Sequence, residues 1–565
     1  MKTRHFRLAV VGLGLAAGLI GGAPGAARAS DNVPGKPYEN KLIGFRFRPL
    51  NEWASVPPGT DPRNPQICGF YSDAAKFAGR QGPECQVYAF PVPKSEAVAT
   101  PSASGGEAPP LGDPKPPEDP TVEDLREQFQ SQFRLKSVRQ VVDRYRQGVQ
   151  RMADQALAGV DEKKRKKILS GVRVQDPTDR EIKSDDGTLV ITEAVIAYPL
   201  SREDFDALHI LAGTLRNDEF EVGVVYLIPG SDWKKYGPGI FSSLKSMEFM
   251  EGAEIASARK DLEDALAGKT GDERWIEEIK RKVGPGWDYL QTKNYLVVYD
   301  KAVKPDRVRL IAVQIEAIRK DVYEVMFPPD RPITAISVVR VCKDPQQYSN
   351  YGGPGGSAGY WNSGAQELVF YEDTSKKKDA LRVLNHEAFH QYIFYSVGSI
   401  SPHDWFNEGH GDFFAGFNYD RSGRFIPAKF TWRTSEIKTA VGSKKYVALK
   451  DFMKFSHQQY YSPATIGQNY AQGWSIIWFL RTSKNPAWKG MLETYFNTLK
   501  GEVTKWVDVQ VAAAKTAGTW KEGWKPSFTP DTVEDAAREK ALESIFGGWD
   551  DRKWDRFERE WKDGF

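Results

Sequence analysis

The chain has 565 residues, of which 40% are hydrophobic and 27% are charged, a balance typical of soluble globular proteins. A chain of this length exceeds what one hydrophobic core supports, so we expect roughly two or three domains. Its 78 Lys and Arg residues nearly balance its 75 Asp and Glu residues, and the net charge of +3 gives no electrostatic basis for binding nucleic acid.

The N-terminus has the pattern of a secretory signal peptide over residues 1–29. Basic residues precede an apolar stretch at residues 8–20, and residues 27–29 (Ala-Arg-Ala) supply the small side chains that favour cleavage. A membrane anchor is the alternative, but the apolar run is short for a bilayer span and no later segment is apolar enough to cross one. We therefore predict an exported protein, periplasmic or extracellular, with no stable membrane span after cleavage.

The chain has three cysteines. Cys68 and Cys85 lie close together in a loop-rich region, and in an exported protein they form either a disulfide or two free thiols. Cys342 ends an apolar, strand-like run, which favours a buried thiol.

A first folded segment is expected over residues 38–250. Within it we expect a strand at residues 42–49 that stops at proline, followed by a flexible insertion at 101–120 and a polar helical stretch at 121–168. Two strands at 188–199 and 220–228 and a closing helical segment at 241–247 are expected after it. This order, with Pro49 and Trp53 at its start, resembles the small α/β domains related to the photosystem protein PsbP. The resemblance implies a sandwich-like α/β accessory or binding module and names no catalytic residue; a purely structural domain is the alternative.

Residues 251–284 are charged and favour helix, and the glycines and proline that follow predict the end of a helical connector. A second domain is expected over residues 285–565. Its predicted elements are a strand at residues 295–299, a helix at 307–325 and a strand at 333–341. A glycine-rich segment at 352–364 and another strand at 367–371 follow. The last helix carries Trp554, Phe557 and Trp561 on one face. Together these elements predict an α+β fold.

Residues 386–390 read His-Glu-Ala-Phe-His, and apolar residues at helical spacing around them predict a helix. His386 and His390 then project from one face, at the spacing that two imidazoles need to bind one ion. Glu387 is turned by about 100° around the axis, so it can act on a water at the ion without binding the ion. This is the H-E-x-x-H arrangement of zinc peptidases. The alternative is two histidines that pack on a helix for structural reasons.

Glu408 follows far enough downstream for the chain to turn and enter a second, antiparallel helix. A catalytic zinc takes three protein ligands and keeps a fourth position open, and two histidines with one glutamate are a recognised set. Asp412 lies one helical turn after Glu408, and zinc-bound histidines usually donate their second N–H to a carboxylate. We therefore predict that His386, His390 and Glu408 bind Zn²⁺ and that Asp412 supports one of the histidines.

These residues resemble those of the gluzincin metallopeptidases. Asn407, Glu408 and Asp412 match the N-E-x-x-x-D element of thermolysin-like members, and residues 405–409 (Trp-Phe-Asn-Glu-Gly) match the W-x-N-E-G element of the aminopeptidases. The sequence is most similar to exported peptidase-MA-like domains, which share a Gly-Tyr strand upstream and a Y-A-Q…W segment downstream. The resemblance covers about residues 285–565 and implies a zincin domain: a small mixed sheet, the H-E-x-x-H helix and a mostly helical C-terminal part.

The resemblance implies that Glu387 is the general base and that a tyrosine or histidine after the third ligand stabilises the tetrahedral intermediate. Tyr470, which heads the Y-A-Q segment, is our candidate; His457 is the runner-up, and a tyrosine that only caps a helix is the structural alternative. In gluzincins an edge strand before the zinc helix pairs with extended substrate. Residues 367–371 are expected in that role, with a fully paired interior strand as the alternative.

Gluzincin aminopeptidases carry a G-x-M-E-N element whose glutamate binds the free amine of the substrate. Residues 359–364 (Gly-Tyr-Trp-Asn-Ser-Gly) contain no glutamate, which favours an endopeptidase acting on a peptide or protein. Two other functions remain open: a non-catalytic, zinc-containing binding protein, against which the intact Glu387 argues, and a zinc hydrolase of a non-peptide bond in the cell envelope.

Overall fold

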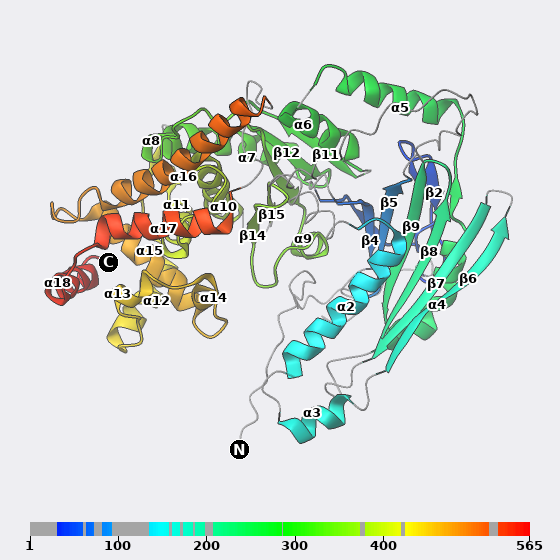
Figure 1. The fold of residues 1–565 in the computed structure, drawn as a ribbon, viewed down its shortest axis with the longest axis horizontal. Helices are drawn as coiled ribbons and strands as arrows, with labels where there is room; N and C mark the ends of the chain where they lie inside the picture. The colour runs from blue at the N-terminus through cyan, green and yellow to red at the C-terminus, as the bar shows by residue number, and fades with distance from the viewer. Residues whose placement is uncertain are drawn as a thin grey trace, which may run out of the picture. The chain divides into compact units, whose positions relative to one another are not determined.

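The computed structural model describes residues 31–59, 64–72, 82–92, 135–157, 161–169, 173–184, 187–197, 207–269, 271–284, 286–372, 379–419, 424–518 and 529–565. The expected signal peptide at 1–29 and the expected insertion at 101–120 lie outside these ranges. The fold is α+β, as predicted, and the chain divides into two compact units (Figure 1). Unit 1 comprises Met1–Lys269 and Glu277–Pro285, and unit 2 comprises Thr270–Ile276 and Gly286–Phe565.

Unit 1 is built on a seven-stranded antiparallel sheet with the strand order β3-β4-β5-β9-β8-β7-β6. The strands are β3 (Ala54–Val56), β4 (Gln66–Tyr71), β5 (Glu84–Pro91), β6 (Arg173–Ser184), β7 (Gly187–Ala197), β8 (Leu208–Arg216) and β9 (Phe220–Pro229). Helices α2 (Val138–Leu157) and α4 (Gly230–Leu244) cover opposite faces of this sheet (Figure 1).

Both faces of the central strand β9 are buried, which explains its nearly continuous apolar sequence. Val225 and Leu227 pack in the cluster that includes α2, whereas Val224 and Tyr226 pack in the cluster that includes α4. A Cβ at Gly223 would lie 2.3 Å from a methyl carbon of Val138, so only glycine lets α2 approach the sheet this closely. Of the seven strands, the sequence predicted only β7 and β9.

The predicted strand at 42–49 is shorter than expected. Residues 41–44 form a turn, with Gly44 at a φ of 72°, between β1 (Tyr38–Asn40) and β2 (Phe45–Phe47). Strand β10 (Glu248–Phe249) completes this small sheet. In the predicted helical stretch, α2 is followed by α3 (Glu162–Leu169), and residues 121–134 lie outside the described ranges.

The cysteines are all free and buried, so the disulfide considered for Cys68 and Cys85 is wrong. The two residues lie on neighbouring strands, but the register places Cys68 opposite Val87 and Cys85 opposite Phe70. Burial raises the pKa of the Cys68 thiol to about 12, so this thiol stays protonated at neutral pH. Cys342 is a buried thiol, as predicted.

The charged segment at 251–284 forms α5 (Ala253–Leu266) and α6 (Gly271–Lys282). The division between the units passes through α6, because the helix up to Ile276 groups with unit 2 and its remainder groups with unit 1.

Unit 2 contains a five-stranded mixed sheet with the order β11-β12-β13-β15-β14. The strands are β11 (Trp287–Gln291), β12 (Tyr295–Asp300), β13 (Ser337–Cys342), β14 (Gly359–Asn362) and β15 (Glu367–Tyr371). Strands β12, β13 and β15 are parallel, and β11 and β14 are antiparallel edges. The prediction that residues 367–371 form the edge is therefore wrong. The chain folds back as a hairpin, so β14 lies outside β15 and becomes the edge.

One face of this sheet packs against α7 (Pro305–Ile318) and α10 (Asp379–Ser396). The predicted helix at 307–325 continues from α7 through a π-helical turn at Arg319–Tyr323 into α8 (Glu324–Met326). A short helix, α9 (Pro345–Asn350), precedes β14.

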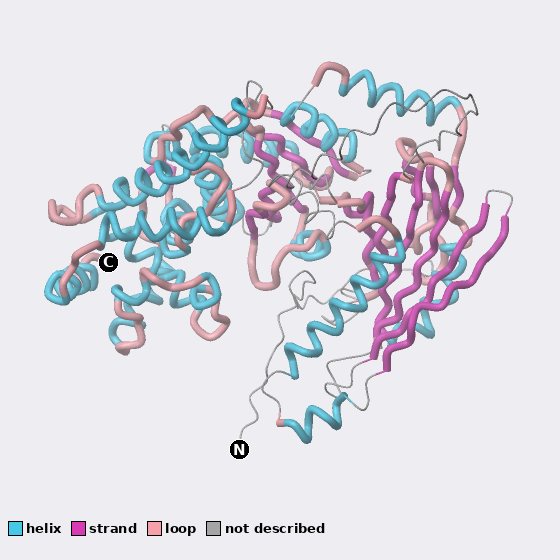
Figure 2. The backbone as a smooth tube through the Cα atoms, in the orientation of Figure 1, coloured by secondary structure: helices cyan, strands magenta, loops and turns pink. Residues whose placement is uncertain are grey.

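After α10 the unit is mostly helical (Figure 2). The helices are α11 (Asp404–Ala415), α12 (Thr431–Gly442), α13 (Leu449–Phe452), α14 (His457–Tyr460), α15 (Ile466–Thr482), α16 (Met491–Thr516), α17 (Asp531–Phe546) and α18 (Asp551–Lys562), with a two-stranded β16 (Asn418–Tyr419) and β17 (Phe425–Ile426) after α11. Trp554, Phe557 and Trp561 are buried, which confirms the predicted apolar face of the last helix. Within the described ranges, no helix has the length and apolarity needed to cross a bilayer.

Candidate metal centre

Helix α10 is fixed to the sheet and to its neighbours by hydrogen bonds from buried side chains. Gln391 donates to the backbone carbonyl of Val338 in β13 at 3.1 Å. Tyr323, at the end of the π-helical turn, donates to the carbonyl of Asn385 at 2.6 Å. The Asn385 side chain in turn accepts from Gln314 of α7 at 2.8 Å. These contacts set the rotation of α10 about its axis, and hence the direction in which its histidines point.

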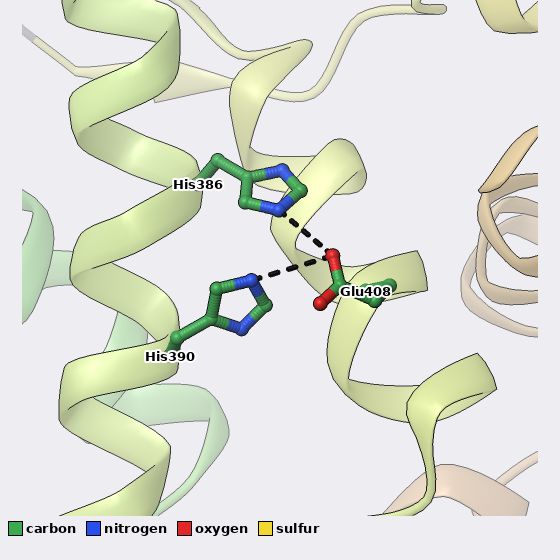
Figure 3. Close-up of side chains that lie close together, drawn as sticks. All are labelled: His386, His390 and Glu408. Atoms are coloured by element: carbon green, nitrogen blue, oxygen red, sulfur yellow. Dashed lines mark hydrogen bonds and ion pairs between the residues drawn. The ribbon is translucent and has the colours of Figure 1, made fainter. Parts of the chain in front are cut away.

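His386 and His390 project from α10 toward Glu408 of the neighbouring α11 (Figure 3). The Nε2 atoms of His386 and His390 lie 3.1 Å and 3.4 Å from the same Glu408 oxygen. One ligand atom from each of the three residues lies within 4.8 Å of the others, so together they could hold a metal ion. The structure thus brings together the three residues that the sequence singled out.

A glycine in α11 makes room for the His386 ring. A Cβ at Gly411 would lie 2.7 Å from Cε1 and 2.8 Å from Nε2 of His386, closer than real Cβ contacts. Without a side chain at this position, the imidazole can lie between the two helices with its Nε2 facing Glu408.

We expect Gly411→Ala to displace the His386 ring and to weaken metal binding at least about tenfold. Removing a residue that hydrogen bonds to a metal ligand typically has an effect of this size. The matched control is Gly501→Ala in α16, where an added Cβ meets no atom within 4 Å. The control should bind metal as the unchanged protein does, because alanine only improves helix propensity there. Metal affinity measured by competition with a chelator gives the comparison. Equal affinities in the two variants would contradict this role of Gly411.

Each of the three side chains has a second polar partner. Nδ1 of His386 lies 3.2 Å from Asp412, which is the support that the sequence predicted. Nδ1 of His390 donates to the amide oxygen of Asn407 at 2.9 Å. With both Nδ1 atoms occupied in this way, both Nε2 atoms are left to face a metal ion.

The third partner is Tyr461, whose hydroxyl donates to Glu408. Sequence reasoning missed both Asn407 and Tyr461 as supports. Asn407 could have been found, because it directly precedes the predicted third ligand. Tyr461 could not, because nothing in the local pattern after α14 places its side chain against α11.

The charges in the cluster shift the pKa values of its members strongly. Burial alone would lower the pKa of His386, but the carboxylates of Asp412 and Glu408 outweigh it and raise this pKa well above its usual value. Burial opposes ionisation of Glu408 too, yet the two histidines hold the pKa of its carboxyl well below its usual range. The site is therefore a compact set of paired charges, with an anionic oxygen at its centre.

Glu387 lies beside this set but outside its hydrogen bonds. The residue is 9% exposed, and no described residue donates a hydrogen bond to its carboxylate. Burial raises its pKa, against the opposing effect of His386 and His390. A Cβ at Gly359 would lie 3.0 Å from Cγ of Glu387, so the edge strand β14 runs directly past this side chain.

Tyr470 of α15 lies next to the same cluster. Its ring centroid is 6.4 Å from that of His386, with the planes 24° apart, and 6.1 Å from that of Tyr461. Burial, followed by the negative charge of Glu408, raises the pKa of Tyr470 well above its usual value, so the phenol keeps its proton at neutral pH. No described residue accepts or donates a hydrogen bond at its hydroxyl, which leaves that proton available to a ligand.

His457, the alternative to Tyr470, has a different environment. Its Nδ1 lies 3.3 Å from Asp404 at the start of α11, and its side chain is 79% exposed. Its ring is tilted by 47° against the ring of Tyr461, with 4.4 Å between the centroids. The geometry therefore favours Tyr470 over His457 as the group nearest to the histidines.

His403, which precedes α11, gives the unit a dependence on pH. The Tyr495 hydroxyl accepts a hydrogen bond from the backbone N–H of His403 and lies 2.7 Å from Nδ1 of its ring, to which it can donate when the imidazole is neutral. Burial, helped by the positive charge of Arg538, lowers the pKa of His403 to about 4, whereas a free histidine has a pKa of about 6.5.

Because the unfolded chain binds this proton more tightly, we expect stability to fall as the pH drops from about 6.5 to 4, by about 1–3 kcal/mol. His403→Asn keeps an acceptor for Tyr495 but cannot titrate, so its stability should lose less over the same range. Urea unfolding of both metal-free proteins at pH 7 and pH 4.5 measures the difference. Identical losses in the two proteins would assign the effect to other groups.

The donor set fits a metal ion of the zinc type. Two imidazole nitrogens and one carboxylate oxygen converge from two packed helices, both histidines are oriented by their second nitrogen, and Gly411 keeps space at the ring edge. This is the composition of three-ligand catalytic zinc sites, which leave a fourth position for water or substrate.

Comparisons with known proteins find one family model that matches the part of the chain containing the site, and its description names no activity. A family described as "Protein of unknown function (DUF1570)" matches residues 381–497, a span that contains His386, Glu408 and Tyr470. The match covers less than half of the chain. No curated protein matches the sequence.

Among solved structures, the chain is similar to the solution structure of cyanobacterial PsbP (CyanoP) from Synechocystis sp. PCC 6803. The identity is 14%, the similarity covers 40% of this chain and 98% of that chain, and the TM-score is 0.20.

Proposed function

We propose that the protein is an exported zinc-dependent endopeptidase of the gluzincin type, with its catalytic site in unit 2. The observation that carries the proposal is the convergence of His386, His390 and Glu408 beside the buried carboxylate of Glu387, to which no described residue donates a hydrogen bond. A purely structural zinc site would have no use for a further carboxylate to which no described residue donates a hydrogen bond.

His386, His390 and Glu408 would hold the zinc, with Asp412, Asn407 and Tyr461 orienting them. A bound zinc supplies Lewis acidity, which activates a water and polarises the scissile carbonyl. Glu387 accepts the proton of that water and passes it to the leaving amine. Burial raises the pKa of Glu387, which makes its carboxylate a better proton acceptor.

Tyr470, next to His386, also supports the proposal. Its phenol is protonated and close to His386, and it makes no hydrogen bond to any described residue, so it can donate to the oxyanion that forms at the substrate carbonyl. Among the described strands, β14 pairs only with β15, so its other edge is open, and the strand passes Glu387. An extended peptide that pairs with the open edge would bring its backbone alongside the general base.

Endopeptidase action is favoured over removal of N-terminal residues. Both glutamates described in the segment before α10 are already engaged. Glu367 is held by Arg340 at 2.6 Å and by the Tyr351 hydroxyl at 2.5 Å, and Glu372 is held by Arg307 at 2.8 Å. A pocket that binds a free amine needs a carboxylate with open lone pairs.

The test is the zinc content of the purified protein without residues 1–29, combined with cleavage of a mixed peptide library. One zinc per chain and internal cleavage sites would support the proposal. One zinc per chain without cleavage of any peptide would favour the binding protein or the hydrolase of a non-peptide bond. A metal-free protein that cleaves peptides equally well would contradict the proposed mechanism.

A further inference from the structure

One arginine touches both the support of a candidate metal ligand and the candidate oxyanion donor. Arg433, in the first turn of α12, is 8% exposed. Its Nε donates to one Asp412 oxygen at 2.6 Å, and the other oxygen of Asp412 lies 3.2 Å from Nδ1 of His386. The same guanidinium lies 4.9 Å from the centroid of the Tyr470 ring.

We infer that Arg433 is a positioning residue that orients the metal ligand His386, through Asp412, and the Tyr470 ring at the same time. The part of the inference that concerns His386 stands on the geometry of the metal centre alone. The part that concerns Tyr470 rests on the proposed function.

The first link is a pair of hydrogen bonds that share one buried carboxylate. Asp412 is 3% exposed and has one oxygen engaged by Arg433 and the other by His386. Bonds between ionised partners are shorter and stronger than neutral ones, and here each restricts rotation of the carboxylate. Without Arg433, Asp412 would lose one of its two partners, and the His386 ring would lose a fixed support.

The second link is the contact between a flat cation and an aromatic ring. The guanidinium packs on Tyr470 and also lies 4.5 Å from the centroid of Trp432, so rings flank it from both α12 and α15. Such contacts gain strength where water is excluded. A lysine ammonium keeps the charge but lacks the planar surface that stacks on a ring.

Arg433 is itself held in place relative to α15. Its NH1 lies 3.4 Å from Glu436, one turn later in α12. A Cβ at Gly467 of α15 would lie 2.6 Å from a carboxylate oxygen of Glu436, so the two helices approach closely at this point. From α12, Arg433 therefore contacts both α11, which carries Glu408 and Asp412, and α15, which carries Tyr470.

The test compares Arg433→Gln with Arg433→Lys in the full chain. Zinc affinity is measured by competition with a chelator, and the coordination geometry is followed by the visible absorption of bound Co²⁺. We expect the glutamine variant to bind zinc about tenfold more weakly and to show a changed Co²⁺ spectrum, because His386 loses its support. We expect the lysine variant to restore affinity and spectrum, because an ammonium can still bind Asp412.

The two variants should also separate in catalysis. On any peptide that the unchanged protein cleaves, the lysine variant should keep KM but lower kcat by about 10- to 100-fold. A loss of this size is expected when a catalytic group, here Tyr470, is shifted from its position. The matched control is Arg307→Gln, which removes another arginine paired with a buried carboxylate, Glu372, in the same unit. It should change thermal stability without changing zinc affinity, Co²⁺ spectrum or kcat.

Three results would overturn the inference. The first is an unchanged zinc affinity and Co²⁺ spectrum in Arg433→Gln. The second is an equal loss of affinity in Arg307→Gln, which would make the effect one of general stability. The third is full recovery of kcat in Arg433→Lys, which would remove the link to Tyr470. If the unchanged protein cleaves no peptide, the proposed function fails, and the zinc and Co²⁺ measurements still decide the link to His386.

Discussion

Glu387→Gln is expected to keep the fold and the bound zinc while lowering peptide hydrolysis by about 10²- to 10⁴-fold, the contribution typical of a positioned general base. Glutamine has nearly the same shape as glutamate but cannot accept a proton near neutral pH. Because no described residue donates a hydrogen bond to the Glu387 carboxylate, the substitution breaks no contact that stabilises the helix pair. Turnover and zinc content, measured on the same preparation, separate the two effects.

The matched control for this change is Glu324→Gln, which removes a carboxylate paired with Arg319 in the same unit but away from the histidines. It should retain both zinc and turnover. The proposed mechanism would be wrong if Glu387→Gln hydrolysed peptide at the rate of the unchanged protein. Loss of zinc from the same variant would instead show that Glu387 belongs to the ligand set.

The residues of the candidate site that sequence alone identified are those within one helix or one turn of each other. His386, Glu387 and His390 share a helix whose period fixes their directions, and Asp412 follows Glu408 by one turn. Such relations depend only on helix geometry, so a sequence pattern contains them. The meeting of Glu408 with the two histidines needed one further step, the antiparallel packing of α10 and α11.

The supports contributed by other helices could not be predicted in this way. Arg433 and Tyr461 reach the site from α12 and from the turn after α14, and their positions depend on how four helices pack. The close approach of Gly411 to His386 is of the same kind. The periodicity of the sequence does not predict these contacts, because each forms between residues that only the tertiary fold brings together.

The prediction of the edge strand in unit 2 was wrong for a related reason. Residues 367–371 were predicted as a strand, whereas residues 359–362 lie in the segment predicted only to be glycine-rich, and the order of the two strands in the sheet depends on which of them pairs with β13. In unit 1, β6 was missed because its sequence (Arg-Val-Gln-Asp-Pro-Thr-Asp-Arg-Glu-Ile-Lys-Ser) is charged and lacks apolar alternation. That composition suits the edge position that β6 occupies, where charges discourage pairing with other chains.

Glu408→Ala is expected to lower zinc affinity by more than about 100-fold, beyond the range seen when only an outer partner of a ligand is removed. Glu408 contributes the oxygen that both histidines face, and Tyr461 holds it in that position. Tyr461→Phe should therefore give a smaller loss, about tenfold, because the ligand stays while its support goes. Zinc should correspondingly raise the unfolding temperature of the unchanged protein but not that of Glu408→Ala, since a ligand stabilises only the state that binds it.

The matched control is Asp404→Asn, which removes another carboxylate from the same helix, one that pairs with His457 and not with the histidines of α10. It should bind zinc as tightly as the unchanged protein. Titration with zinc under chelator control, followed by thermal unfolding with and without the metal, gives all four affinities and shifts. Stoichiometric, undiminished zinc in Glu408→Ala would remove Glu408 from the ligand set, and with it the three-ligand geometry on which the proposed hydrolysis depends.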